Sequence, residues 1–162
     1  MPELLAIIEK GKREPHNSTS DLGRRGEMLA ARYVSESGYR IVVSNFKVPV
    51  GRNRNDAKVT GEIDIVALDG ETLAFIEVKT RSSEEFLPII TAVDRRKQRQ
   101  ITRTARAYLR AFNIRGVQYR FDVVTVLIEK RKDPVIELRK GFWSEANFRK
   151  RSWNDNAWNE FA

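Results

Sequence analysis

The chain of 162 residues contains no cysteine and a single histidine, His16. Without cysteine it can form neither disulfides nor thiolate metal sites, and we expect a reducing, cytoplasmic location. One histidine in a polar N-terminal segment excludes a Ser-His-Asp triad built on a core histidine, and also a histidine-rich zinc site. Any bound metal must therefore be held by oxygen ligands, which favours Mg²⁺ or Mn²⁺.

Long apolar runs are also missing. No stretch approaches the roughly 20 apolar residues of a membrane span, so we expect no membrane partner. The first residues, "MPELLAIIEKGKRE", contain a short apolar run but no small-residue cleavage pattern. We therefore interpret residues 1–20 as an N-terminal extension, either flexible or a short helix, rather than a signal peptide.

Charge is abundant and unbalanced. The 30 Lys and Arg residues against 22 Asp and Glu give a formal net charge of +8 and a pI of about 10.0. Such a balance favours a polyanionic partner such as DNA or RNA, with a merely basic protein as the alternative. The hydrophobic content of 41% and the length together predict one domain with a real core.

The apolar periodicity and the turn residues predict an α/β chain with a mixed sheet. We expect a helix with Asp21 as N-cap and Gly38 as its stop, a strand at 39–48, a loop or extended hairpin at 49–60, strands at 61–68 and 72–81, a helix at about 91–112, a strand at 118–129 and an edge strand at 133–141. The second helix is long enough for a crossover, so the strands around Ile76 and Val123 should run parallel.

Charged residues interrupt the two apolar strands that a tight Asp-Gly turn joins, in "GEIDIVALDGETLAFIEVKTR". Strand alternation predicts that Ile63 and Ile65 share one face and that Asp64 lies on the other. Glu77 and Lys79 share a face of the partner strand. If the faces match, Asp64, Glu77 and Lys79 converge at the open end of the hairpin.

Two carboxylates at one point repel each other unless a cation lies between them. We therefore predict a magnesium site with Asp64, Glu77 and the Val78 backbone carbonyl as candidate ligands. Lys79 could orient a water, lower the pKa of that water, or neutralise charge on a phosphate. The alternative is a surface hairpin on which Glu77 and Lys79 form a solvated ion pair.

The second predicted helix has a basic face. Nine basic residues and no acidic one lie between residues 95 and 120. Such a face is either solvated or binds phosphates. Lys97 lies at the edge of the apolar side, where it can reach both the sheet and a phosphate. The candidate nucleic-acid-binding residues are Lys97, Arg96, Arg99, Arg103 and Arg106, with Arg81 at the end of the preceding strand.

"GEID" followed by "EVK" resembles the Asp…Glu-x-Lys signature of the PD-(D/E)XK nucleases, the restriction-endonuclease-like superfamily. The wider order "LGRRGEMLAARYV", "GYRIVVSNFKV", "GEIDIVALDGETLAFIEVKTR", "AVDRRKQRQI" and "YRFDVVTV" is similar to the YraN family of uncharacterised, predicted endonucleases, over residues 22–127. The chain departs from that pattern in a longer segment at 49–60, and at 84–93 by lacking an expected glycine and glutamate.

The resemblance implies an α/β, restriction-endonuclease-like fold with an αβββαβ core, a central sheet flanked by helices. It carries over Asp64, Glu77 and Lys79 as catalytic residues, with Glu27 of the first helix as a further acidic member. The chain also resembles archaeal Holliday-junction resolvases, which place a helical glutamate similarly. We therefore expect residues 21–141 to form a nuclease-like domain, followed by a tail at 142–162.

The expected activity is Mg²⁺- or Mn²⁺-dependent hydrolysis of phosphodiester bonds, in DNA rather than RNA, with branched or structured DNA as a candidate substrate. The rival is a non-catalytic nucleic-acid-binding protein that keeps the fold, and a third interpretation is a protein-interaction module. One site cuts one strand, so cleavage of both strands implies a homodimer.

Glu27 lies in an arc of small helix residues, which predicts a partly desolvated carboxylate near the Asp64–Glu77 pair, on the order of 7 Å or less away. The alternatives are an ion pair with Arg24 or Arg25, or plain solvation.

Overall fold

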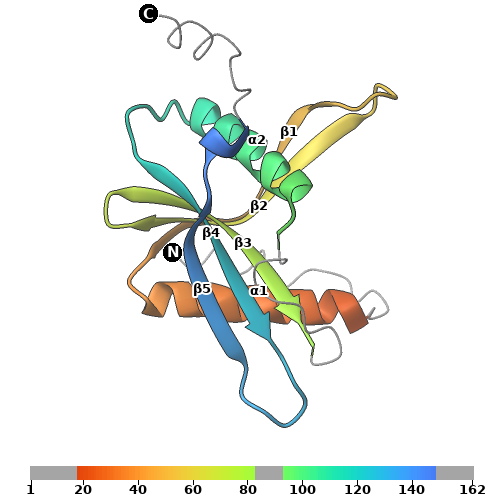
Figure 1. Ribbon diagram of the computed structural model, residues 1–162, viewed down its shortest axis with the longest axis vertical. Helices are drawn as coiled ribbons and strands as arrows, with labels where there is room; N and C mark the ends of the chain where they lie inside the picture. The colour runs from red at the N-terminus through yellow and green to blue at the C-terminus, as the bar shows by residue number, and fades with distance from the viewer. Residues whose placement is uncertain (1–17, 83–92, 149–162) are drawn as a thin grey trace, which may run out of the picture.

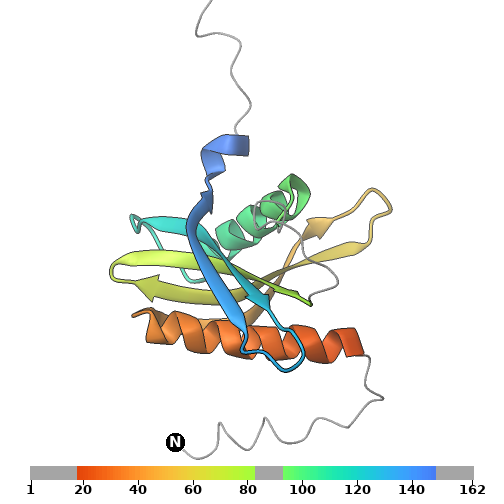
Figure 2. The same ribbon diagram turned by 60° about the horizontal axis from the view of Figure 1, so that its bottom comes forward.

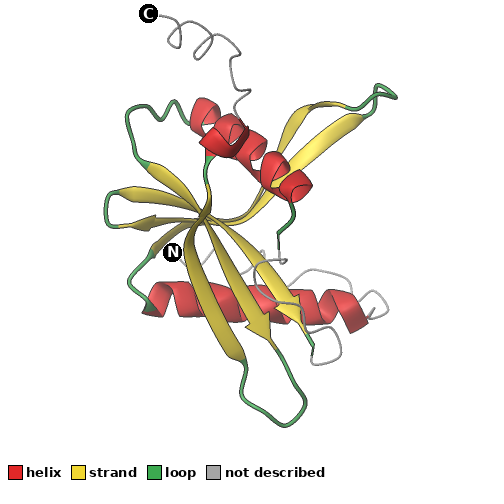
Figure 3. Cartoon of the chain, viewed as in Figure 1, coloured by secondary structure: helices red, strands yellow, loops and turns green. Residues whose placement is uncertain are grey.

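The computed structural model describes residues 18–82 and 93–148. In chain order its elements are α1 (Ser18–Glu36), β1 (Arg40–Arg52), β2 (Lys58–Asp69), β3 (Thr72–Arg81), α2 (Arg95–Ala111), β4 (Tyr119–Leu127), β5 (Val135–Trp143) and the 3₁₀ helix η3 (Glu145–Phe148). The strands form one five-stranded sheet in the order β1-β2-β3-β4-β5, in which only β3 and β4 are parallel. The predicted αβββαβ order and the predicted parallel pair are confirmed (Figure 3).

The sheet lies between the two α-helices (Figures 1 and 2). On one face α1 packs Val34 against a buried cluster that includes Ile76. On the other face α2 packs Ile101 against a cluster that includes Phe75 and Phe121. Burial on both faces explains why β3 and β4 are apolar almost throughout. No helix in the described ranges is long and apolar enough to cross a membrane.

The helix boundaries differ in part from the expected ones. α1 begins at Ser18, so the prediction of Asp21 as its N-cap is wrong; Asp21 lies in the first turn, where a negative charge interacts favourably with the helix dipole. Gly38 ends this helix as predicted, with a positive φ of 93°. α2 begins at Arg95 because the Asp94 carboxylate accepts a hydrogen bond from the Lys97 N–H. The predicted start at residue 91 lies outside the described residues.

Two strands run further than expected. Most of the segment 49–60 is the outer half of the β1–β2 hairpin, which projects beyond the rest of the sheet (Figure 1). β5 continues to Trp143, whose ring is buried and stacked 4.8 Å from that of Phe121. The expected boundary between domain and tail at residues 141 and 142 therefore falls inside β5, an edge strand whose last residue is buried. Residues 1–17 and 149–162 lie outside the described part of the chain.

Candidate active site

The site lies where β2 and β3 separate. Their pairing runs from Asp69–Thr72 to Ile65–Ile76 and ends there, and β2 continues with β1 as the projecting hairpin (Figure 1). We call this point the fork. Past it the strand twists: Ile65 packs on the α1 side of the sheet, whereas Ile63 packs on the α2 side. The predicted shared face of Ile63 and Ile65 is therefore wrong, because simple alternation does not survive the twist.

A kink in β1 accompanies the twist. The residues that pair with Ile65 and Ile63 are Ser44 and Phe46, and the residue between them, Asn45, has a positive φ of 54°. Asparagine tolerates this left-handed conformation better than most residues with a side chain. The kink opposite Asp64 redirects the hairpin and opens the fork.

The Asp64 side chain replaces a backbone partner for β3 beyond the point where the β2–β3 pairing ends. Its Oδ2 accepts a hydrogen bond of 2.7 Å from the Val78 N–H, in place of a ladder bond. Because the N–H and C=O of a strand residue point to the same side, the Val78 carbonyl also points into the fork. Burial and the neighbouring Glu77 charge raise the pKa of Asp64 to about 7, against the lowering effect of the Val78 hydrogen bond.

Glu77 is the most buried acid of the site, with 3% of its side chain exposed. Two ammonium groups share one of its oxygens: Oε1 lies 3.0 Å from Lys79 Nζ and 3.5 Å from Lys97 Nζ. The other oxygen, Oε2, is buried and has no hydrogen-bond partner within the described residues. An unpaired buried acceptor costs about 1–3 kcal/mol, which makes this oxygen the clearest candidate ligand atom.

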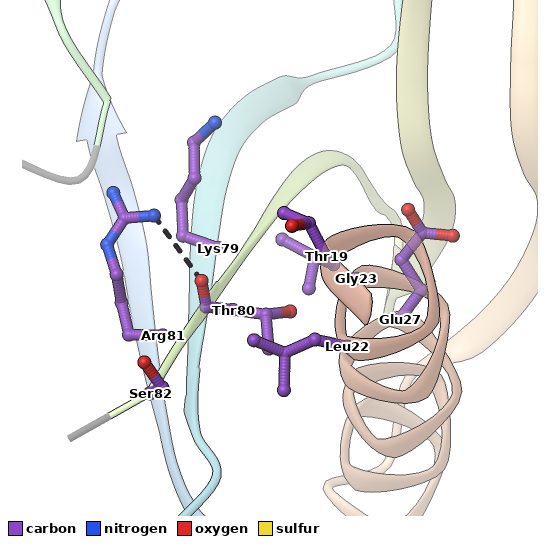
Figure 4. Close-up of a pocket in the computed structure, with 9 residues that line it drawn as sticks. Thr19, Leu22, Gly23, Glu27, Lys79, Thr80, Arg81 and Ser82 are labelled. Atoms are coloured by element: carbon purple, nitrogen blue, oxygen red, sulfur yellow. Dashed lines mark hydrogen bonds between the residues drawn. The ribbon is translucent and has the colours of Figure 1, made fainter. Parts of the chain in front are cut away.

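Glu27 stands at the rim of the same site. Gly26 packs against the Thr80 side chain so closely that a Cβ atom would clash with it, which brings α1 onto β3 at this point. Burial, and then the charges of Glu62 and Glu77, raise the pKa of Glu27. Figure 4 shows Glu27 and Lys79 on opposite walls of a groove of about 510 Å³. The catalytic role of Glu27 stays a prediction.

The donors at the fork fit a hard cation that keeps part of its water shell. In the described ranges no three His, Cys, Asp or Glu side chains are arranged to hold a metal ion. Two carboxylates and the Val78 carbonyl remain as protein donors, which suits Mg²⁺ better than a metal that needs a closed protein cage. The metal stays a prediction.

The predicted nucleic-acid-binding residues do not form one surface. Lys97 turns inward to Glu77, and Arg81 lines the groove, where its Nη1 donates to the Thr80 carbonyl (Figure 4). Arg96 and Arg103 lie exposed on α2, and no acidic partner is found for them in the described ranges.

Two other arginines of α2 have partners that the sequence did not indicate. The Arg106 guanidinium binds both carboxylate oxygens of Glu145, at 2.9 and 3.2 Å. The Arg99 guanidinium lies 5.6 Å from the centre of the Phe148 ring. Both partners belong to η3, so this short helix covers part of the basic face. Because Glu145 and Phe148 are far along the chain from α2, no local signal in the sequence predicts these contacts.

The chain is similar to known proteins over most of its length. A family model described as "Uncharacterised protein family UPF0102" matches residues 26–126. A UPF0102 protein of Chlorobium limicola is 40% identical over 138 residues, covering 82% of this chain and 96% of the relative. One of Moorella thermoacetica is 40% identical over 120 residues, covering 74% and 92%. Among solved structures, Hjc of Archaeoglobus fulgidus, a Holliday junction resolvase, aligns with a TM-score of 0.35 at 19% identity over 71% of this chain and 75% of that one.

Proposed function

The chain belongs to the UPF0102 family, which is the YraN family that its motifs resemble. We propose that it is a metal-dependent nuclease that hydrolyses phosphodiester bonds in DNA. The observation that carries the proposal is the buried Glu77 carboxylate, whose Oε2 has no partner in the described residues, beside Asp64 at the fork. A carboxyl whose pKa is raised by burial and by a second carboxylate, with a lysine beside that carboxylate, is typical of a catalytic site rather than of a structural ion pair.

Each residue of the fork has a role in this proposal. Asp64, Glu77 and the Val78 carbonyl would hold the divalent ion, which when bound supplies Lewis-acid activation of the phosphodiester and of the attacking water. Lys79 pairs with Glu77 at 3.0 Å and is placed to stabilise negative charge that develops on the phosphate. Attack of water on phosphorus then breaks one P–O bond, and the leaving oxygen takes a proton from solvent.

The exposed cations suggest where the nucleic acid lies. Arg81 lines the groove beside Lys79, and Arg96 is in the same helical turn as Lys97. A backbone following these cations would pass the fork with its phosphates toward Lys79. Such contacts position a strand without reading its sequence, so we propose recognition of DNA by backbone and shape.

A cleavage panel tests the activity: single-stranded, duplex, flap and four-way-junction DNA, together with RNA, each with Mg²⁺ and with Mn²⁺. We expect metal-dependent cleavage of at least one DNA, lost in Asp64→Asn, Glu77→Gln and Lys79→Ala. The Lys79→Ala protein should still bind DNA, since most phosphate contacts lie on other residues.

The rival function, a non-catalytic nucleic-acid-binding protein, has one specific observation in its favour. Lys79 and Lys97 already surround Glu77 with positive charge without any metal. The rival predicts salt-sensitive DNA binding, no cleavage with either metal, and Mn²⁺ affinity that Asp64→Asn leaves unchanged. A protein-interaction module would show no salt-sensitive nucleic-acid binding at all.

A further inference from the structure

Lys97 sits where local helix chemistry disfavours it. The first turn of α2 contains Arg95, Arg96 and Lys97 and no acidic residue. Cations at the positive end of a helix dipole are unfavourable by a few tenths to about 1 kcal/mol each, so such a sequence needs a compensating interaction. For Lys97 that interaction is the ion pair with Glu77, on the neighbouring strand β3.

The backbone and the side chain of Lys97 are held by contacts of different strength. Its backbone N–H donates to the Asp94 carboxylate at 2.8 Å, which fixes the residue at the start of α2. Its side chain is 36% exposed and its Nζ lies 3.5 Å from Glu77 Oε1, a looser contact than the 3.0 Å of Lys79. A lysine side chain of this kind can change rotamer and move its ammonium to solvent without moving the helix.

The two ammonium groups beside Glu77 disfavour the binding of another cation there. A divalent ion between Asp64 and Glu77 would lie beside two ammonium groups, and like charges at such distances repel strongly in a partly buried site. The ammonium that leaves most easily is the more exposed and more distant one, Lys97. Once it has left Glu77 it needs another anion, and the anion that the proposed reaction brings to the fork is a phosphate.

We propose that Lys97 is an exchangeable counter-ion of Glu77, which it neutralises in the metal-free protein and releases for a substrate phosphate when a divalent cation binds. Lys97 thereby competes with the metal and couples metal binding to phosphate binding. The proposal rests on the metal site of the proposed function and adds the regulation of that site.

The test measures Mn²⁺ affinity by titration calorimetry in the wild type, in Lys97→Met and in Lys47→Met. Lys47 is the matched control, because it is a lysine near Glu27 that pairs with Glu62 and has no recorded ion pair with Glu77. Loss of the competing ammonium should raise the Mn²⁺ affinity of Lys97→Met about tenfold, whereas Lys47→Met should change it about twofold or less. Mn²⁺ should correspondingly raise the thermal stability of Lys97→Met more than that of the wild type.

The same titrations in the presence of thymidine 5′-monophosphate measure the coupling, since this probe carries a phosphate but no phosphodiester bond to cut. In the wild type and in Lys47→Met the nucleotide should raise Mn²⁺ affinity about fivefold or more, and in Lys97→Met this coupling should fall. The proposal is wrong if Lys97→Met and Lys47→Met have equal Mn²⁺ affinities, or if the coupling is the same in both.

The two proposals fail in distinguishable ways. If Asp64→Asn abolishes Mn²⁺ binding and Lys97→Met behaves as the control, only the role of Lys97 is wrong. If the wild type binds no Mn²⁺, or binds it equally after Asp64→Asn, the metal site itself is wrong and the role of Lys97 falls with it.

Discussion

Asp64 and Asp122 are both acids in strands, and their surroundings give them opposite effects on stability. Asp122 is fully buried and both its oxygens are used: Oδ1 accepts from Arg120 Nε and the Gly141 N–H, and Oδ2 accepts from the Tyr39 hydroxyl. Asp64 has one hydrogen bond and a carboxylate neighbour that raises its pKa. We therefore expect removal of the Asp122 charge to destabilise the fold and removal of the Asp64 charge to stabilise it.

Replacing Asp64 by Asn should stabilise the metal-free protein at pH 8. The pKa of Asp64 is raised to about 7, so the folded state holds this proton more tightly than the unfolded chain does. Wild-type stability therefore falls as the pH rises from about 4 to 7, and the gain from Asp64→Asn should be about 1–3 kcal/mol larger at pH 8 than at pH 5. Urea unfolding in EDTA at the two pH values measures it, and an equal gain at both would contradict the assignment.

Replacing Asp122 by Asn should have the opposite sign. The substitution removes the charge that Arg120 pairs with, 2.8 Å away, inside the sheet. We expect a loss of about 2–4 kcal/mol in the free energy of unfolding, as for other broken buried ion pairs. Arg120 also pairs with Asp69, at 2.6 Å. Chemical denaturation at pH 7 measures the loss, and a neutral result would show that Asp69 alone satisfies Arg120.

At the scale of elements, α1 contains two glycines in very different surroundings, and only one of them positions the acid at the rim of the site. A Cβ atom at Gly26 would clash with the Thr80 side chain, whereas one at Gly23 would meet nothing within 4 Å. Close packing at Gly26 is therefore what brings Glu27 onto the groove, and Gly23 only weakens the helix.

Gly26→Ala should destabilise the protein by about 1–3 kcal/mol, because overpacking forces α1 away from β3. Gly23→Ala, the matched control on the same helix, should be neutral or stabilise it by up to about 1 kcal/mol. Thermal unfolding of both variants and of Gly26→Ala combined with Thr80→Ala tests the contact. The double variant should recover part of the loss, and no recovery would place the strain elsewhere.

The cations on the basic face of α2 differ in their ion pairs. Within the described residues Arg96 and Arg103 have no acidic partner, whereas Glu145 of η3 pairs with Arg106 and raises the pKa of its guanidinium through their hydrogen bonds. Cations without an ion pair can release counterions from DNA without first breaking a salt bridge.

The double substitution Arg96→Ala with Arg103→Ala should weaken DNA binding and reduce the salt slope, by up to about 0.9 for each lost phosphate contact. Arg106→Ala should leave the slope nearly unchanged. Fluorescence anisotropy with a labelled duplex over a salt series gives the slopes. A slope that changes with Arg106 but not with the other two would reverse the assignment of the binding face.

For the whole molecule, the proposed activity predicts what one copy can cut. One site hydrolyses one strand, so a single copy is expected to nick a duplex. The rate of nicking should then rise in proportion to protein concentration, whereas linearisation of a plasmid in one binding event should rise more steeply if two copies assemble. Plasmid relaxation and sedimentation at matched concentrations measure both, and linear products from a monomer at low concentration would exclude the dimer requirement.

The amino-acid sequence by itself determined the element order and the parallel β3–β4 pair, and it made Asp64, Glu77 and Lys79 candidates. These rest on strand alternation, the Asp-Gly turn and a helix long enough for a crossover. Glu27 became a candidate through the resemblance to a nuclease family. In the structure Glu77 is buried between Lys79 and Lys97. Strand alternation had predicted that Glu77 and Lys79 share a face.

The helical pattern predicted that Lys97 can reach the sheet, and its contact with β3 confirms this. Only the tertiary structure decided the fork, the choice of Glu77 as the partner of Lys97, and the contacts of η3 with α2. The fork lies where pairing between β2 and β3 ends, next to the left-handed Asn45 of β1, and the twist of the sheet at this point is not visible in the alternation of residues. The contacts Lys97–Glu77 and Arg106–Glu145 join residues on different elements. No periodicity in the sequence encodes such pairs, because they form only when packing of the core brings the elements together.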